Sequence, residues 1–181
     1  MPPMRVLRLH VNGDELELAA PEHWSLLEVL RYRAGLTGSK QGCDKGDCGA
    51  CTVLIDGEPQ LACLLVPATL EGRAITTIEG LAPAHRRAGG EGVDPVQDAF
   101  DQCGALQCGF CQPGMILSAK ALLTRNPQPS HRQIQDALAG NLCRCTGYTQ
   151  IYQAVERAAE ELAAAATGAT GTDAAGTGEQ V

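Results

Sequence analysis

Aromatic residues are scarce in this chain of 181 residues, which has one Trp, three Tyr and two Phe. A hydrophobic core must therefore be built from Leu, Val, Ile and Ala side chains. A chain of this length forms one domain or two small ones, and small domains bury too little apolar surface to be robust on packing alone. The composition thus favours additional support from bound metal or from a partner protein. The six aromatic positions are Trp24, Tyr32, Phe100, Phe110, Tyr148 and Tyr152.

Clusters of basic residues are also missing, and the formal net charge is −7. Nucleic-acid binding needs grouped Lys and Arg side chains that neutralise phosphates, so the sequence argues against a nucleic-acid partner. No run of 18 apolar residues occurs, which argues against membrane insertion. The N-terminal residues lead directly into an alternating pattern and lack the apolar core of a signal peptide. We therefore expect a cytoplasmic protein.

Cysteine, in contrast, is abundant, with nine residues of this type. In a chain without an export signal these thiols would stay reduced, so they are better candidates for metal ligands than for disulfides. Four lie in the first 63 residues and five lie between 103 and 145, with a cysteine-free gap of 39 residues between the two groups. This division predicts two separate sites.

The first eighty residues have the pattern of a β-rich domain that contains one helix. Residues 6–11 and 16–18 alternate in polarity around the turn Asn12-Gly13, which predicts a hairpin. Ser25 and Glu28 have the spacing of a capping box, and apolar residues with helical spacing follow. A second hairpin is predicted from strands over 52–55 and 60–65 around Asp56-Gly57. The combination is typical of an α+β fold.

The second half of the chain has helical rather than alternating periodicity. Residues 82–94 contain turn residues and charges without a period, as a linker does, and four helical patterns follow, separated by short connections. From residue 163 onward Ala, Thr and Gly dominate, a composition that cannot form a core. We therefore divide the chain into a β-rich domain (1–81), a linker (82–94), a four-helix domain (95–162) and a flexible tail (163–181).

The first group of cysteines has the spacing Cys-x4-Cys-x2-Cys-x11-Cys, which is typical of a plant-type [2Fe–2S] loop. Glycines interrupt this loop, where they allow backbone N–H groups to approach the sulfur atoms. We expect the fourth cysteine on the second strand of the adjacent hairpin. A structural zinc site is the alternative, although zinc sites usually pair two Cys-x2-Cys units. The predicted ligands are Cys43, Cys48, Cys51 and Cys63.

The second group combines Cys-x2-Cys with Cys-x-Cys after 31 residues, a spacing compatible with either iron–sulfur or zinc. Covalent haem attachment is excluded because Gln112, not His, follows the first pair. The ninth cysteine, Cys103, lies on an apolar helical stripe, and we expect it to serve in packing. The candidate ligands of the second site are Cys108, Cys111, Cys143 and Cys145.

Three stretches carry a resemblance to one family: GCDKGDCGACTV at 42–53, QCGFCQPGM at 107–115 and GNLCRCTGY at 140–148. They resemble the small iron–sulfur subunit of molybdenum hydroxylases, which include xanthine dehydrogenase, aldehyde oxidoreductase, carbon monoxide dehydrogenase and 4-hydroxybenzoyl-CoA reductase. The likeness runs from about residue 5 to residue 162. One departure is Gln112, where the family often has Thr.

This resemblance implies a β-grasp ferredoxin domain followed by a four-helix bundle, each with one [2Fe–2S] cluster. It also implies a large subunit with molybdopterin, in bacteria often as the cytosine dinucleotide, and a medium subunit with FAD, assembled as a dimer of heterotrimers. Gln107 and Cys145 would border the pterin, and the loop over 43–63 would face the flavin. Such a chain relays single electrons in an oxidoreductase complex and carries no catalytic residue. The alternatives are a structural zinc-binding adaptor and a free-standing ferredoxin that serves several partners.

Overall fold

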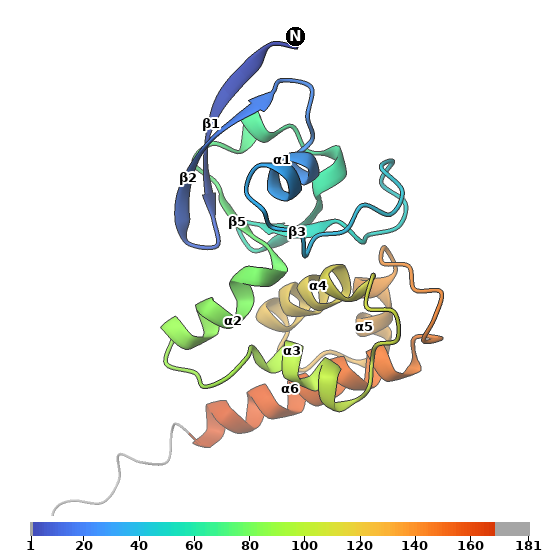
Figure 1. Cartoon of the computed structure of the whole chain (residues 1–181). Helices are drawn as coiled ribbons and strands as arrows, with labels where there is room; N and C mark the ends of the chain where they lie inside the picture. The colour runs from blue at the N-terminus through green and yellow to red at the C-terminus, as the bar shows by residue number, and fades with distance from the viewer. Residues whose placement is uncertain (1, 169–181) are drawn as a thin grey trace, which may run out of the picture.

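The computed structural model describes residues 2–168, which form a β-rich part followed by a helical part (Figure 1). The β-rich part contains β1 (Met4–Val11), β2 (Asp14–Pro21), α1 (Leu26–Tyr32), β3 (Thr52–Ile55), β4 (Glu58–Leu61) and β5 (Ala74–Thr76), with short 3-10 helices η1 (Ala62–Leu64) and η2 (Pro67–Leu70). The helical part contains α2 (Ile78–Arg87), α3 (Pro95–Gln102), α4 (Gln112–Arg125), α5 (His131–Leu138) and α6 (Thr149–Gly168). The predicted α+β class is confirmed.

The sheet has the strand order β2-β1-β5-β3-β4, and α1 packs against it through Leu26, Val29 and Leu30. Strands β1 and β2 form the predicted hairpin, and both turn residues, Asn12 and Gly13, have positive φ. Strand β5 pairs in parallel with β1, which closes the β-grasp arrangement. The predicted capping box at the start of α1 is present, with both Ser25 and Glu28 bonded to backbone N–H groups.

The second hairpin differs from the prediction in its second strand. We expected a strand over residues 60–65, but β4 spans Glu58–Leu61, and the chain then turns into η1. Cys63 therefore lies in a 3-10 helix and not on a strand. Strand β4 begins earlier than predicted because the two-residue turn at Asp56-Gly57 pairs Ile55 directly with Glu58.

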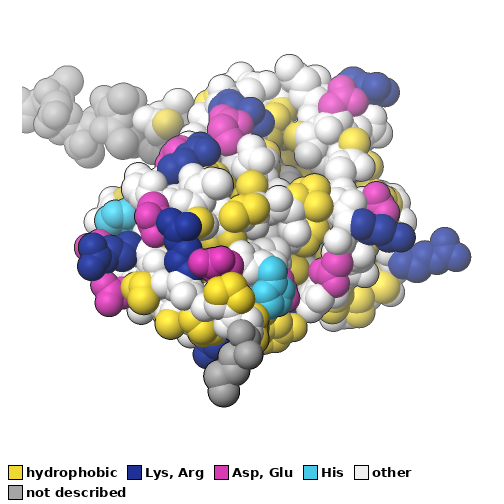
Figure 2. Space-filling model, turned by 90° about the horizontal axis from the view of Figure 1, so that it is seen from above, with side chains coloured by type: hydrophobic (Ala, Val, Ile, Leu, Met, Phe, Trp, Pro, Cys, Tyr) yellow, Lys and Arg dark blue, Asp and Glu magenta, His cyan; other side chains and the backbone are white. Residues whose placement is uncertain are grey.

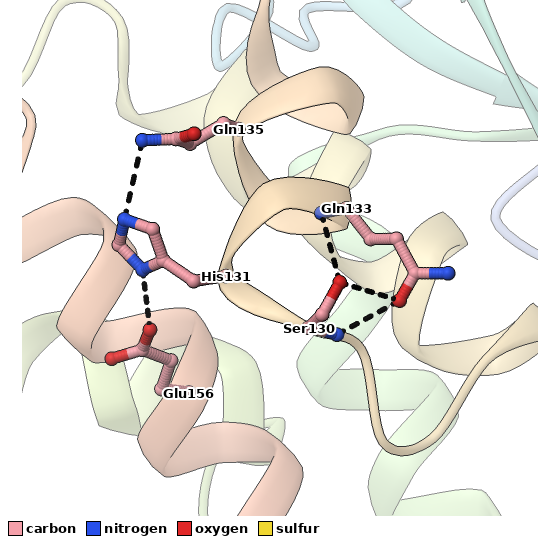
Figure 3. Close-up of polar contacts among 5 residues, drawn as sticks. All are labelled: Ser130, His131, Gln133, Gln135 and Glu156. Carbon is pink, nitrogen blue, oxygen red and sulfur yellow. Dashed lines mark hydrogen bonds and ion pairs between the residues drawn. The ribbon is translucent and has the colours of Figure 1, made fainter.

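The four helices predicted after the linker are confirmed as α3 to α6, and they surround a core of Leu, Ile, Val and Ala side chains together with Phe100 and Met115. Ser130 caps α5 in a capping box with Gln133 (Figure 3). In the same view His131 lies between Gln135 and Glu156, and its 2.7 Å contact with the Glu156 carboxylate joins α5 to α6.

Two predicted boundaries were wrong. The first half of the expected linker is helical, because α2 runs over Ile78–Arg87. The side chain of Leu81 in this helix is buried. Basic side chains in its last turn lie next to the negative end of the helix dipole and stabilise the helix. The start of the tail was also predicted too early, at residue 163, since α6 continues to Gly168. Ala has the highest helix propensity, so the Ala-rich stretch after residue 162 prolongs the helix. Residues 169–181 lie outside the described part of the chain.

The two parts pack against each other through α4 and β3, and Leu54 of β3 belongs to the core of the helical part. Arg125 at the end of α4 forms an ion pair of 2.9 Å with Glu58 of β4. Seen from the sheet side, hydrophobic side chains remain exposed between acidic and basic ones (Figure 2). Among residues 2–168, no helix is both long and apolar enough to cross a membrane.

Candidate metal centres

The loop between α1 and β3 carries three of the four cysteines of the first predicted site. Arg31 of α1 fixes the start of this loop by donating to the carbonyl oxygens of Thr37 and Ser39 at 2.9 and 2.7 Å. The chain then makes tight turns with positive φ at Asp44 and Gly46. Because the φ of Gly46 is +87°, a side chain there would be strained, which explains a glycine in this turn.

The four thiols of the first site meet in two pairs. The thiol of Cys43 interacts with that of Cys48, and the thiol of Cys51 with that of Cys63, so η1 brings Cys63 to the loop. A Cβ atom at Gly42 would come within 2.7 Å of the Cys48 sulfur, so a side chain at this position would crowd that thiol. The predicted set Cys43, Cys48, Cys51 and Cys63 is thus gathered at one place.

The thiols of the first site differ in their tendency to lose a proton. Backbone N–H groups of Lys45, Cys48 and Asp47 lower the pKa of Cys43 to about 7, and the Asp47 nitrogen lies 3.3 Å from its sulfur. Burial raises the pKa of Cys51 to about 12. A bound metal ion deprotonates such a thiol outright, because the cation offsets the cost of burying the negative charge.

The second site lies where α4 begins and where the chain turns from α5 into α6. Cys111 is the N-cap of α4, with Cys108 just before it. The Cys145 thiol donates to Cys108 across 3.5 Å, and the thiol of Cys143 interacts with that of Cys111. Here too the four thiols form two pairs, although the members of each pair are more than thirty residues apart in sequence.

Hydrogen bonds around Cys143 favour its thiolate. Burial alone would raise the pKa of Cys143, but the hydroxyl and the backbone N–H of Thr146 lower it to about 7, at 3.2 and 3.5 Å from the sulfur. The Tyr148 hydroxyl accepts from the Cys143 backbone N–H at 2.8 Å and donates to the Asn141 carbonyl at 3.2 Å. Tyr148 itself has a φ of +70°, a strained backbone that these contacts hold in place.

The paired arrangement fits [2Fe–2S] clusters better than single ions. Among residues 2–168, no three Cys, His, Asp or Glu side chains are placed to hold one metal ion. A structural zinc site needs four ligands around a single ion. A [2Fe–2S] cluster with four cysteines needs two thiolates for each of its two irons, and two pairs of thiols are what each site offers. The donor set and the N–H groups aimed at sulfur therefore fit the cluster.

The other predicted site residues have clear positions. The Gln107 amide donates to the carbonyl oxygen of Cys145 at 3.1 Å, so these two residues lie together at the exposed edge of the second site. Cys103 lies outside both sites and packs, half-buried, against the helical core. Three side chains that support the candidate ligands were not predicted from the sequence, although all lie inside the 140–148 motif: Asn141, Thr146 and Tyr148.

Two family models match the chain, one over the β-rich part and one over the helical part. Residues 9–77 match the family model described as 2Fe-2S iron-sulfur cluster binding domain, and residues 77–156 match the one described as [2Fe-2S] binding domain. The nicotinate dehydrogenase small FeS subunit of Eubacterium barkeri is 42% identical over 157 residues, which cover 87% of this chain and 96% of that protein.

Two further relatives extend this likeness. A probable xanthine dehydrogenase subunit from Bacillus subtilis (strain 168) is 46% identical, with 86% of each chain covered. The crystal structure of quinoline 2-oxidoreductase from Pseudomonas putida 86 superimposes with a TM-score of 0.81 at 39% identity, covering 89% of this chain and 97% of that one. Fold, thiol pairs and relatives agree: the chain belongs to the small [2Fe–2S] subunits of the molybdenum hydroxylase family, the two-cluster electron-transfer subunits of these oxidoreductases.

Proposed function

We propose that Cys43, Cys48, Cys51 and Cys63 hold one [2Fe–2S] cluster and that Cys108, Cys111, Cys143 and Cys145 hold the other. The observation that carries this assignment is the meeting of the thiols in two pairs at each site. The clusters supply one-electron redox chemistry, and this chain binds them, donates hydrogen bonds to their ligands and excludes bulk water from the inner thiols.

We infer that the second site faces a molybdopterin held by a large partner subunit, as the cytosine dinucleotide. Cys108 and Cys145 are exposed, whereas Cys111 is buried. Exposed apolar side chains surround this edge, among them Leu106 and Phe110 at 43% and 45% exposure. Exposed apolar groups next to a redox centre are typical of a surface that a partner covers. Gln107 would then bond the pterin, beside the backbone of Cys145.

We propose that the first site faces a medium subunit with FAD. A surface groove of about 470 Å³ opens beside Cys63, and its lining includes Trp24, Leu64 and Val66. The carboxylates of Glu22 and Glu28 lie along the same groove. An electron partner could approach Cys63, a proposed ligand of the first cluster, through this groove.

A direct hydrogen bond joins the two sites and supports the proposed relay between them. The backbone N–H of Leu142 donates to the carbonyl oxygen of Cys48 at 2.9 Å. Leu142 precedes Cys143 in the chain, so this bond connects a proposed ligand of each cluster through only a few covalent bonds. Electrons would pass between the molybdenum and flavin subunits by this route.

We propose a cytoplasmic complex that assembles as a dimer of heterotrimers. The relatives named above act on nicotinate, xanthine and quinoline, so similar small subunits serve enzymes with different substrates. We therefore assign the choice of substrate to the large partner subunit and not to this chain.

The test is to purify the intact complex with single Cys→Ser substitutions and to record electron paramagnetic resonance spectra after reduction. The unaltered complex should show two distinct [2Fe–2S] signals. Cys43→Ser should remove or change one of them and Cys143→Ser the other, whereas the matched control Cys103→Ser should leave both unchanged. A single signal from the unaltered complex, or the loss of a signal in the Cys103→Ser control, would overturn the ligand assignment.

A further inference from the structure

Asn141 is buried between the two proposed cluster sites and bonds to both sides. Its side-chain nitrogen donates to the carbonyl oxygen of Gly49 at 3.0 Å and lies 3.3 Å from the Thr52 hydroxyl. Its side-chain oxygen accepts from the Ser118 hydroxyl of α4 at 2.8 Å. Only 4% of Asn141 is exposed, and every polar atom of its carboxamide has a partner.

The three segments that Asn141 joins are those that hold the ligands. Gly49 lies between Cys48 and Cys51 in the first loop, Ser118 is on the helix that begins at Cys111, and Asn141 is two residues before Cys143. In Figure 1 the loops around residues 45 and 142 lie on the same side of the molecule, and the bond between Leu142 and Cys48 confirms their contact.

Backbone segments approach one another closely at this junction. A Cβ atom on Gly114 would overlap the carbonyl oxygen of Gly49, and one on Gly49 would overlap the carbonyl oxygen of Gly140. The backbones of the two loops therefore lie close together, and the Asn141 carboxamide bonds across this contact.

We propose that Asn141 is a positioning residue that fixes the distance and orientation of one cluster relative to the other. The inference rests on the proposed ligand sets. Electron transfer by tunnelling falls steeply with distance, so a small separation of the loops slows the relay although every ligand is retained. A carboxamide suits this position because it donates to the Gly49 carbonyl and accepts from Ser118 at the same time.

The alternatives to Asn fail in defined ways. Ala provides no polar group and leaves the Ser118 hydroxyl without its acceptor. Asp has the same shape and still accepts from Ser118, but it replaces the donor with a second acceptor that faces the Gly49 carbonyl. Both substitutions thus remove the bond to the first loop, and only one of them changes the volume.

The experiment compares the intact complex with its Asn141→Ala and Asn141→Asp variants. The first readout is the spin–spin splitting between the two reduced clusters in electron paramagnetic resonance, and the second is the rate of electron transfer between them. Both variants should retain two clusters and lose part or all of the splitting. We expect electron transfer to slow by about tenfold, the lower end of the loss of activity that follows removal of outer-shell partners.

Two further variants complete the design. Gly114→Ala would place a Cβ atom against the Gly49 carbonyl oxygen and 2.9 Å from the Asn141 side-chain nitrogen. It should weaken the splitting by forcing the first loop and Asn141 away from α4. Asn126→Ala is the matched control, because Asn126 caps the far end of α4 and bonds to Gln133, away from both sites. It should retain the splitting and the rate of the unaltered complex.

The outcomes separate the two proposals. If the unaltered complex lacks two [2Fe–2S] signals, the ligand assignment fails. If it has both signals and their splitting persists unchanged in both Asn141 variants, the positioning role is refuted while the ligand assignment stands. If a variant loses a cluster entirely, Asn141 supports cluster binding instead, and the positioning role is likewise refuted.

Discussion

Replacing Thr146 with Val should lower the reduction potential of the second cluster. The Thr146 hydroxyl lies 3.2 Å from the Cys143 sulfur, and its backbone N–H lies 3.5 Å away. Val has nearly the same shape as Thr, so the substitution removes the hydroxyl while the backbone N–H remains. The same contacts lower the pKa of Cys143 to about 7 against the effect of burial, which shows that they favour negative charge on this sulfur.

The magnitude follows from the charge that reduction adds. A hydrogen bond to a neutral group contributes about 1 kcal/mol, and one to a charged group roughly 1.5–3 kcal/mol. Reduction makes the cluster and its sulfur ligands more negative, so we take the bond from Thr146 to strengthen by about 1 kcal/mol. For a one-electron couple this free energy corresponds to about 40 mV, and Thr146→Val should lower the potential by that amount.

The assay is a redox titration of the intact complex, followed by the electron paramagnetic resonance signal of each cluster. Thr146→Ser is the matched control, because it retains a hydroxyl and should leave the potential close to its original value. An unchanged or higher potential of the second cluster in Thr146→Val would show that this hydroxyl does not stabilise the reduced cluster. The same conclusion follows if the first cluster shifts by the same amount, since the hydroxyl and backbone N–H of Thr146 lie against Cys143, a proposed ligand of the second cluster.

Three further predictions concern stability. Asp94 caps α3, forms a 2.6 Å ion pair with Lys120 and is 2% exposed. Asp94→Ala should therefore lower the free energy of unfolding by roughly 3 kcal/mol in denaturant titrations. A loss below about 1 kcal/mol would contradict this. Ser130→Ala removes the cap of α5 and should cost about 1 kcal/mol in the same titrations, with no change as the contrary result. Hydrogen bonds from Arg73 and from a backbone N–H lower the pKa of Asp56 in the folded state. Its contribution to stability is therefore complete above the ordinary carboxyl pKa of about 4 and is lost as pH falls through the lowered value. Melting temperatures of the native protein and of Asp56→Asn should differ at pH 7 and converge in acid; a constant difference is the opposing result.

Local sequence signals predicted most of the fold because the relevant contacts are short. The Asn12-Gly13 turn and the capping box at Ser25 involve neighbouring residues, and the structure has both where we predicted them. Helical periodicity likewise identified α3 to α6. Strand β5 was missed because three residues are too few to show a period, and it exists only through pairing with β1 and β3.

Within the candidate sites, local sequence patterns indicated the candidate ligands and the grouping of three thiols in one loop, because loop spacing is a local property. Only the tertiary structure brought Cys108 and Cys111 together with Cys143 and Cys145, since packing of α3 to α6 folds the two segments onto each other. It alone placed the two sites in contact through Asn141, whose partners lie 92 and 23 residues away in sequence. Contacts of that separation depend on the packing of α4 against β3, and no local pattern encodes it.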